Sequence, residues 1–280
     1  MGRGKSPETL RIIETCQKIL KAHNPMTLRQ VFYQLVSRQI IENTEARYKA
    51  VSKILISARQ EKIVPWEWIE DRLRIPRAVN MWRDLPDFAE TAVRSYRRDV
   101  WPGQSAYIEV WLEKDALSGI FERQLDGYGV TLNVGRGYDG WTSIHNAADR
   151  FGSGEGGTIL YFGDFDPSGE NMFESLIERL AFFDCQPKLI KCALTLDDIE
   201  RYNLPPAPAK KTDTRAAHFI AKYGNRTVEL DALPLDVLKG RVIEEVESRL
   251  DLGALEHIRE IEDTERKKLL DSMKSMREEG

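Results

Sequence analysis

Residues 158–169 read TILYFGDFDPSG, a short apolar run followed by glycine, aspartate and proline. The run Thr158–Phe162 has the length of a strand, and its unbroken apolar character is typical of a strand buried on both faces. Gly163 and Pro167 favour a turn, and residues 171–183 have the apolar spacing of a helix. A buried strand followed directly by a helix predicts the repeating unit of a parallel α/β sheet.

The same alternation continues on both sides of this stretch. Strand-like segments cover residues 105–112, 130–134 and 188–194, and helical segments cover residues 116–125 and 141–150. A glycine-rich loop at 135–140 and a proline-rich loop at 204–209 separate elements, and the chain from Leu235 onward is helical in pattern. We therefore expect the mixed α/β class, with residues 101–280 forming a Rossmann-like parallel sheet domain with C-terminal helices.

Acidic residues follow two of the predicted strands. Glu113 comes after the strand at 105–112, and Asp164 and Asp166 come after Thr158–Phe162. Parallel strands end at one edge of a sheet, so the three carboxylates can converge there, and in an extended chain the two aspartates point the same way. Mg²⁺ prefers carboxylate ligands, and Mn²⁺ accepts similar ones. In the plainer alternative, the aspartates and Ser168 only cap the helix that follows.

Residues 1–100 form a segment of different character. They hold 19 Lys and Arg against 12 Asp and Glu, whereas residues 101–280 hold 22 against 33, in a chain with a formal net charge of −4. Helical patterns cover residues 6–22, 28–39 and 45–61, with 63–68 as a wing or its return and 77–100 as a further helical segment. Three short helices with a basic surface are typical of a helix-turn-helix or winged-helix DNA-binding module. The alternative is an ordinary protein with uneven surface charge.

Basic side chains of the third predicted helix are candidates for contacts with the DNA backbone. Most of them lie off its apolar side, as a DNA-facing surface requires, although a solvated helix face has the same pattern. Together with one residue of the second helix, the predicted DNA-binding residues are Arg29, Arg47, Lys49, Lys53 and Arg59.

The composition argues against several other classes of protein. No run of eighteen apolar residues is present, and the first residues, MGRGKSPETL, lack the apolar stretch of a secretory signal. The three cysteines lie far apart and the four histidines are scattered, which argues against a disulfide framework and a zinc site. We expect a protein of the reducing cytoplasm, associated with the nucleoid if it binds DNA, with no membrane partner.

Tyr33 is the candidate nucleophile. It lies on the second predicted helix, where Arg29, Tyr33 and Ser37 share a face more polar than that of Phe32, so we expect its hydroxyl to point outward near a guanidinium. A tyrosine hydroxyl that attacks a phosphodiester forms a phosphotyrosine link, and a neighbouring arginine stabilises the developing charge. The alternative is a half-exposed tyrosine that packs or hydrogen-bonds at a domain boundary.

The acidic motifs resemble those of the A subunit of topoisomerase VI and of its relative, the meiotic double-strand-break protein. Glu113–Ala116 and Asp164–Gly169 are similar to the two signature elements of their Toprim domain. Gly135–Asp139 resembles the glycine-rich loop that this family carries between those elements. Glu229–Leu233 resembles a short acidic motif near the family's C-terminus, and the order of all four motifs agrees.

The tyrosine motif extends this resemblance to the N-terminal segment. Arg29, Phe32 and Tyr33 match the pattern around the family's nucleophilic tyrosine, whereas the competing Tyr48 has no arginine at that spacing. The resemblance covers most of the chain, from residue 25 to residue 250. No ATP-binding domain is recognisable in the 280 residues. The chain therefore resembles the short Mini-A homologues that occur on mobile elements.

The resemblance implies a winged-helix domain in residues 1–100, which carries Tyr33, and a Toprim domain in residues 101–280. It also implies that Glu113, Asp164 and Asp166 bind magnesium and that Glu113 assists proton transfer. In this family the tyrosine of one subunit meets the metal site of the other, so a homodimer on double-stranded DNA is implied. An ATPase subunit of the B type is a further expected partner.

Three functions are compatible with these patterns. The first, which we expect, is a magnesium-dependent DNA transesterase that makes double-strand breaks through Tyr33, as a type IIB topoisomerase A subunit does. The second is a Toprim hydrolytic nuclease that cuts with metal-bound water and forms no covalent intermediate. The third is a DNA-binding or bridging module that is inactive without a partner ATPase subunit.

Overall fold

The computed structural model describes residues 5–70, 79–135, 140–152, 156–206 and 216–278. Residues 136–139 of the glycine-rich motif and 207–209 of the proline-rich loop lie outside the described residues. Within the described ranges, no helix combines the length and the apolar character needed to cross a membrane.

The described residues form one four-stranded parallel sheet at the centre of the molecule. Its strands are β1 (Ile108–Leu112), β2 (Thr131–Val134), β3 (Thr158–Phe162) and β4 (Lys188–Ala193), in the spatial order β2-β1-β3-β4. All neighbouring pairs are parallel. The predicted α/β class is confirmed, and each strand lies within the segment predicted for it.

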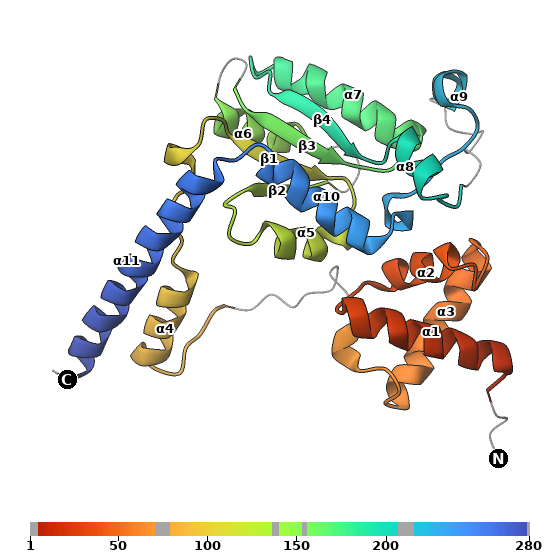
Figure 1. Cartoon of the computed structure of the whole chain (residues 1–280), viewed down its shortest axis with the longest axis horizontal. Helices are drawn as coiled ribbons and strands as arrows, with labels where there is room; N and C mark the ends of the chain where they lie inside the picture. Colours follow the sequence, from red (N-terminus) through yellow and green to blue (C-terminus); the bar gives the residue numbers. More distant parts are fainter. Residues whose placement is uncertain (1–4, 71–78, 136–139, 153–155, 207–215, 279–280) are drawn as a thin grey trace.

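Helices cover both faces of this sheet (Figure 1). Because side chains alternate along a strand, Val110 of β1 joins the core cluster that includes α5 (Ser118–Leu125) and α10 (Leu235–Glu247). Its neighbour Trp111 faces the opposite side, in the cluster that includes α6 (Trp141–Phe151) and α7 (Pro167–Ala181). The helices predicted at 116–125, 141–150 and 171–183 and from Leu235 onward are therefore confirmed, with small shifts at their ends.

The strand order reverses between β1 and β3. From β1 the chain crosses through α5 to β2, and then returns through α6 past β1 to reach β3. The two crossovers lie on opposite faces, so the loops that leave β1 and β3 diverge at the carboxyl edge of the sheet. In open α/β sheets, ligands bind at such a reversal because the diverging loops leave a crevice.

The N-terminal part consists of α1 (Pro7–His23), α2 (Leu28–Ser37) and α3 (Glu45–Gln60), at the positions predicted for three helices. Each begins at a side-chain cap: Ser6 caps α1, Thr27 and Gln30 form a capping box on α2, and Thr44 caps α3. The helices pack through fully buried side chains, including Leu20, Leu35 and Leu55.

The segment at 63–68 forms no wing strand, so that prediction is wrong. It contains the 3-10 turn η1 (Trp66–Trp68), and among the described residues a single parallel bridge, Met26 to Ile69, follows it. Pro65 has no N–H to donate to a ladder. Arg59 further holds the turn, because its Nη2 donates to the carbonyl oxygens of Trp66 and Ile69 at 2.6 and 3.2 Å.

The predicted helical segment at 77–100 contains α4 (Leu85–Ser95), which lies alongside α11 (Leu252–Glu278) and apart from α1–α3 (Figure 1). The chain that follows α4 is also bound to α11, since Arg266 Nη2 donates to Tyr96 O at 2.8 Å. The segment before residue 100 therefore packs on the C-terminal helix, and a domain boundary at that position stays a prediction.

Several short elements lie where the sequence predicted no regular structure. Val228 and Phe165 exchange two backbone hydrogen bonds of 2.9 Å, which bring the segment before η4 beside the end of β3. η4 itself packs against α2. The unpredicted elements are η2 (Trp101–Gly103), α8 (Leu196–Arg201), α9 (Ala216–Tyr223) and η4 (Leu230–Ala232), whereas η3 (Asp115–Leu117) lies at the start of the helix predicted at 116–125.

Glu109 of β1 is a fully buried carboxylate with four donors. Arg150 binds it with two bonds of 2.6 and 3.1 Å, Trp111 Nε1 donates at 2.9 Å, and the Tyr107 hydroxyl donates at 3.0 Å. Because every lone pair is satisfied, the buried charge is tolerated between the sheet and α6.

We expect Glu109→Ala to lower the free energy of unfolding by about 3 kcal/mol, because the donors of Arg150 and Trp111 lose their acceptor. Urea unfolding followed by circular dichroism measures the change. Glu256→Ala, at a side chain that is 66% exposed, is the matched control and should change stability by less than ~0.5 kcal/mol. Equal effects of the two substitutions would contradict a structural role for this network.

Candidate functional site

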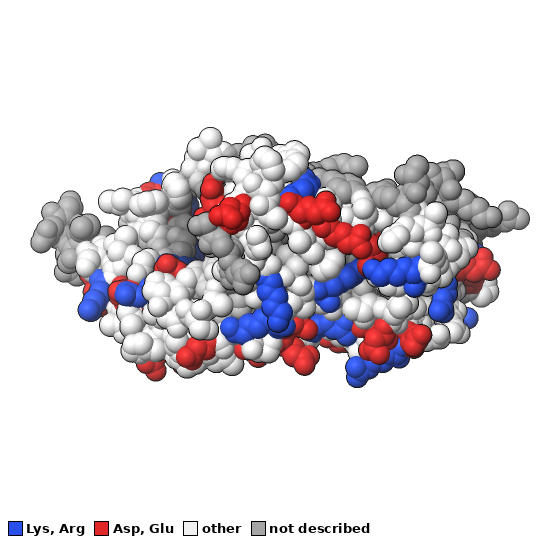
Figure 2. Space-filling model, turned by 90° about the horizontal axis from the view of Figure 1, so that it is seen from above, with Lys and Arg blue, Asp and Glu red and all other residues white. Residues whose placement is uncertain are grey.

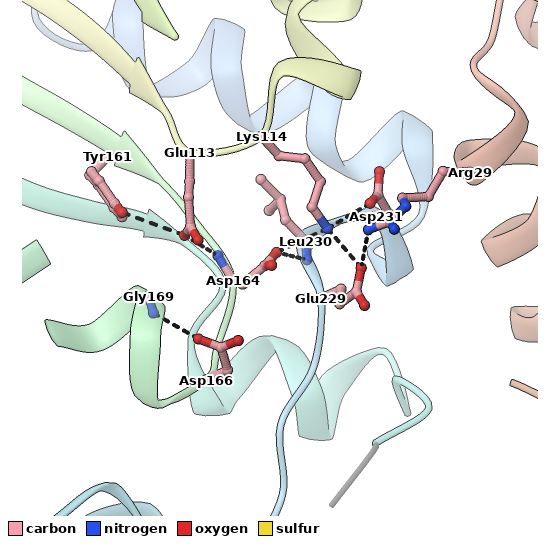
Figure 3. A network of polar contacts seen from close by, with 10 residues as sticks. All are labelled: Arg29, Glu113, Lys114, Tyr161, Asp164, Asp166, Gly169, Glu229, Leu230 and Asp231. Carbon is pink, nitrogen blue, oxygen red and sulfur yellow. Dashed lines mark hydrogen bonds and ion pairs between the residues drawn. The ribbon is translucent and has the colours of Figure 1, made fainter. Parts of the chain in front are cut away.

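The ends of β1 and β3 bring Glu113 and Asp164 together (Figure 3). Leu112 pairs with Phe162, and Glu113 N donates to Phe162 O at 2.9 Å. Asp164 N in turn donates to Oε2 of Glu113 at 2.9 Å. These two acidic residues therefore meet where the strand order reverses, as the strand-end pattern predicts.

Asp166 has a different neighbour from Asp164. Oδ1 of Asp166 accepts from Gly169 N at 2.7 Å and caps α7, whereas Oδ1 of Asp164 accepts from Leu230 N at 2.7 Å. In Figure 3 the two carboxylates point to different partners, unlike the common direction expected for an extended chain. The capping alternative therefore applies to Asp166 and not to Asp164, because the chain turns into α7 directly after Asp166.

Lys114 lies at the centre of an acidic cluster. Its Nζ is 2.7 Å from Oδ2 of Asp231, 2.9 Å from Oε2 of Glu229 and 3.3 Å from Oδ1 of Asp164. The Lys114 side chain is 13% exposed and that of Asp231 is fully buried. Burial alone would lower the pKa of Lys114, but the charges of Asp231, Asp164 and Glu229 outweigh burial and raise it. The ammonium group therefore stays charged inside the protein.

Arg29 and Tyr33 reach the same cluster from α2. Arg29 Nη1 donates to Oε2 of Glu229 at 3.1 Å, and the Tyr33 hydroxyl lies near the Glu229 carboxylate, whose charge raises the pKa of Tyr33. Tyr33 is 6% exposed, and its ring meets Phe32 edge-on with centroids 5.3 Å apart. The expectation of an outward hydroxyl is wrong, because the segment around η4 covers this side of α2.

The acidic groups of the cluster titrate differently. Burial, followed by the charge of Asp164, raises the pKa of Glu113 to about 7. Burial also raises the pKa of Asp164, against the opposing charge of Lys114. Burial would raise the pKa of Glu229 as well, but Lys114 and the Tyr33 hydroxyl outweigh it and lower that pKa. The pKa of Tyr33 is raised by burial and by Glu229. Of Glu113 and Glu229, Glu113 is therefore the carboxyl whose negative charge is less compensated by nearby cations.

The predicted magnesium ligands fit a hard cation in their chemistry. Glu113, Asp164 and Asp166 offer carboxylate oxygens, and a Cβ at Gly163 would lie 2.6 Å from Oε2 of Glu113 and fill the space beside it. A Cβ at Gly169 would likewise lie 3.2 Å from the same oxygen. Within the described residues, however, no group of three or more His, Cys, Asp or Glu side chains is arranged to hold a metal ion. The three carboxylates share one edge of the sheet without forming a ligand shell.

The predicted DNA-contacting side chains of α3 have varied surroundings. Arg47 pairs with Glu8 at 2.8 Å and Lys49 with Glu45 at 2.6 Å. Arg59 holds η1 and stacks over Trp66, 4.1 Å from the ring centroid. Lys53 is exposed. The pairs of Arg47 and Lys49 are exposed and weak, so these side chains stay candidates, whereas Arg59 has a clear structural role.

Charges of both signs are interspersed on the face seen in Figure 2. Lysine and arginine side chains alternate there with aspartate and glutamate over the part of the surface that is described. The charge asymmetry between residues 1–100 and 101–280 therefore does not translate into a uniformly basic surface in this view.

Lys114, Glu229 and Asp231 belong to the site, although the sequence singled out none of them as individual site residues. The available signal was their position, because Lys114 directly follows the strand-end Glu113, and the two acids lie in the acidic motif Glu229–Leu233. Their contact with α2 could not be predicted, since Arg29 and Glu229 are 200 residues apart in the chain.

No protein-family model matches the chain, and a search of curated proteins finds no match. The resemblance to topoisomerase VI A subunits therefore rests on the motifs quoted above, and their geometry carries the functional argument.

We expect Lys114→Met to lower the free energy of unfolding by about 3 kcal/mol, because it leaves the buried Asp231 carboxylate without its cation. Thermal or urea unfolding measures the loss. Lys49→Met removes a cation from an exposed pair and should change stability by less than ~0.5 kcal/mol. If Lys114→Met were as mild as this control, the cluster would contribute little to the fold.

Proposed function

We propose that this chain is a DNA strand-cleaving transesterase of the topoisomerase VI A type, with α1–α3 as a DNA-binding domain of the helix-turn-helix kind and the sheet as its Toprim domain. One observation carries the proposal: Arg29 shares the Glu229 carboxylate with Lys114, which also contacts Asp164 beside Glu113, and Tyr33 lies near the same carboxylate. A candidate nucleophile, two cations and the strand-end acids therefore belong to one contact network.

Each group in this network has a role in breaking a phosphodiester. The Tyr33 oxygen attacks the phosphorus and the bond to the 3′ oxygen breaks, so one phosphoester bond replaces another and the break can be resealed. The tyrosyl proton must leave, and the raised pKa of Tyr33 means that an acceptor is needed at the moment of attack. Glu229 lies near this hydroxyl in the free protein, and Glu113 offers a carboxyl for proton transfer to the leaving oxygen.

Glu113, Asp164 and Asp166 are the residues that would hold magnesium in this proposal. The ion would supply charge neutralisation on the scissile phosphate. Arg29 would orient that phosphate from the α2 side, where its side chain is 47% exposed.

We further propose that the protein acts as a homodimer on double-stranded DNA, with each subunit cutting one strand and with an ATPase subunit as partner. The family resemblance supports this assembly. Within one chain, α2 packs against η4 and Tyr33 lies near its own Glu229, so an exchange of tyrosines between subunits requires α2 to leave η4.

Tyr33→Phe should abolish covalent protein–DNA adducts and leave DNA affinity within ~2-fold, because the ring packing on Phe32 is kept. The measurement is plasmid cleavage in magnesium or manganese, quenched with denaturant and analysed with and without proteinase. Tyr48→Phe is the matched control, since Tyr48 also meets the Phe32 ring edge-on at 5.3 Å.

The control should form adducts as the wild type does. Breaks that need no proteinase and persist in Tyr33→Phe would support the hydrolytic nuclease instead. Binding without breaks under any metal condition would support a DNA-binding module that depends on its partner.

Glu113→Gln should lower cleavage by about 100-fold or more while DNA binding is retained, because it removes the acidic group but keeps an acceptor for Asp164 N. Chelation with EDTA should have the same effect on the wild type. Initial rates of plasmid cleavage measure both. Full activity of Glu113→Gln would exclude this residue from metal binding and from proton transfer.

A further inference from the structure

One oxygen of Glu229 occupies a position that suits a phosphate oxygen. Oε2 of Glu229 lies 2.9 Å from Lys114 Nζ and 3.1 Å from Arg29 Nη1, and the Tyr33 hydroxyl lies near this carboxylate. An arginine and a lysine that converge on one anionic oxygen are donors by which proteins bind phosphate. Figure 3 shows Arg29 and Lys114 approaching Glu229 from different elements.

Glu229 is also the member of the cluster that can leave most easily. Its side chain is 41% exposed, and that of Arg29 is 47% exposed, so this side of the cluster is open to solvent. If Glu229 moves away, Lys114 keeps Asp231 at 2.7 Å and Asp164 at 3.3 Å, and its charge stays compensated. Asp231 is fully buried and has no such freedom.

A phosphodiester cannot use these donors while Glu229 holds them. Two anions at one set of cations repel each other, so DNA binding at this position requires displacement of the carboxylate. The displaced Glu229 would release Arg29 and uncover the nearby Tyr33 hydroxyl, because Arg29 binds this carboxylate and Tyr33 lies beside it.

We propose that Arg29 and Lys114 form a binding site for a phosphodiester of duplex DNA beside the Tyr33 hydroxyl, and that Glu229 is an internal competitor which fills this site in the free protein. The choice of DNA as ligand rests on the proposed function. Lys114 is thereby a phosphate-binding residue, and Glu229 controls access to the nucleophile.

Glu229→Gln tests the competition, because it removes the charge and keeps the shape of the side chain. The probe is a short fluorescein-labelled DNA duplex, without added metal, followed by fluorescence anisotropy. We expect Glu229→Gln to bind about tenfold more tightly than the wild type. Glu256→Gln on α11 removes the same charge away from the site, from a side chain that is 66% exposed, and should change affinity by less than about twofold.

A second substitution identifies the donor that is released. In the wild type, loss of the Arg29–phosphate contact is partly offset by loss of the Arg29–Glu229 pair, so Arg29→Met should weaken binding less than it does in the Glu229→Gln background. In the Glu229→Gln background, the same substitution should remove most of the gain. Thermal unfolding midpoints of all variants show whether each is folded, and Arg29 is exposed enough for its replacement to be tolerated.

The outcomes separate this inference from the proposed function. If Glu229→Gln binds no more tightly than Glu256→Gln, or its gain survives Arg29→Met, the internal competition is refuted even where Tyr33-linked adducts are found. If the gain and its dependence on Arg29 are found without adducts, the competition holds and the transesterase proposal fails. If none of the proteins binds the duplex, both are refuted.

Discussion

The buried ammonium group of Lys114 is the interaction on which the arrangement of the site depends. Removal of an ammonium group from water is costly, and only closely placed anions with good geometry offset the cost. Here Asp231, Asp164 and Glu229 supply them at distances between 2.7 and 3.3 Å. These acids come from the end of β3 and from the η4 segment, so one cation joins elements that are far apart in the sequence. Because η4 packs on α2, the same contact determines where the N-terminal helices meet the sheet.

The position of Lys114 also divides the acidic residues into two groups. Asp231 and Glu229 lie on the side of the cations, and Glu229 has a lowered pKa there despite its burial. Glu113 lies on the other side, where burial and Asp164 raise its pKa to about 7. A further cation would be stabilised beside Glu113, whereas an anion that displaces Glu229 would be stabilised beside Arg29 and Lys114. This separation suits the proposed function, which requires both a metal ion and a phosphate to be bound.

The topology of the sheet explains why Lys114 and the acids around it lie at one edge. The chain passes to opposite faces after β1 and after β3, so the loops that follow these strands diverge, and Glu113, Lys114 and Asp164 lie where they separate. Val228 then pairs with Phe165 directly after Asp164, which delivers Glu229 and Asp231 to the same edge. This antiparallel bridge and the hydrogen bond from Leu230 N to Asp164 thus help to hold the η4 segment at the site.

Local patterns in the sequence determined the strands and helices of this protein. The apolar run Thr158–Phe162, the caps at Ser6 and Thr27 and the strand-end position of Glu113 are local features, and the structure has the elements they predict. Only the tertiary structure decided that Tyr33 is covered, that Asp164 binds Leu230 N while Asp166 caps α7, and that Lys114 links α2 to the sheet through Glu229. The physical reason is distance along the chain: the groups that cover and pair these residues lie up to 200 positions away, and no local periodicity encodes such contacts.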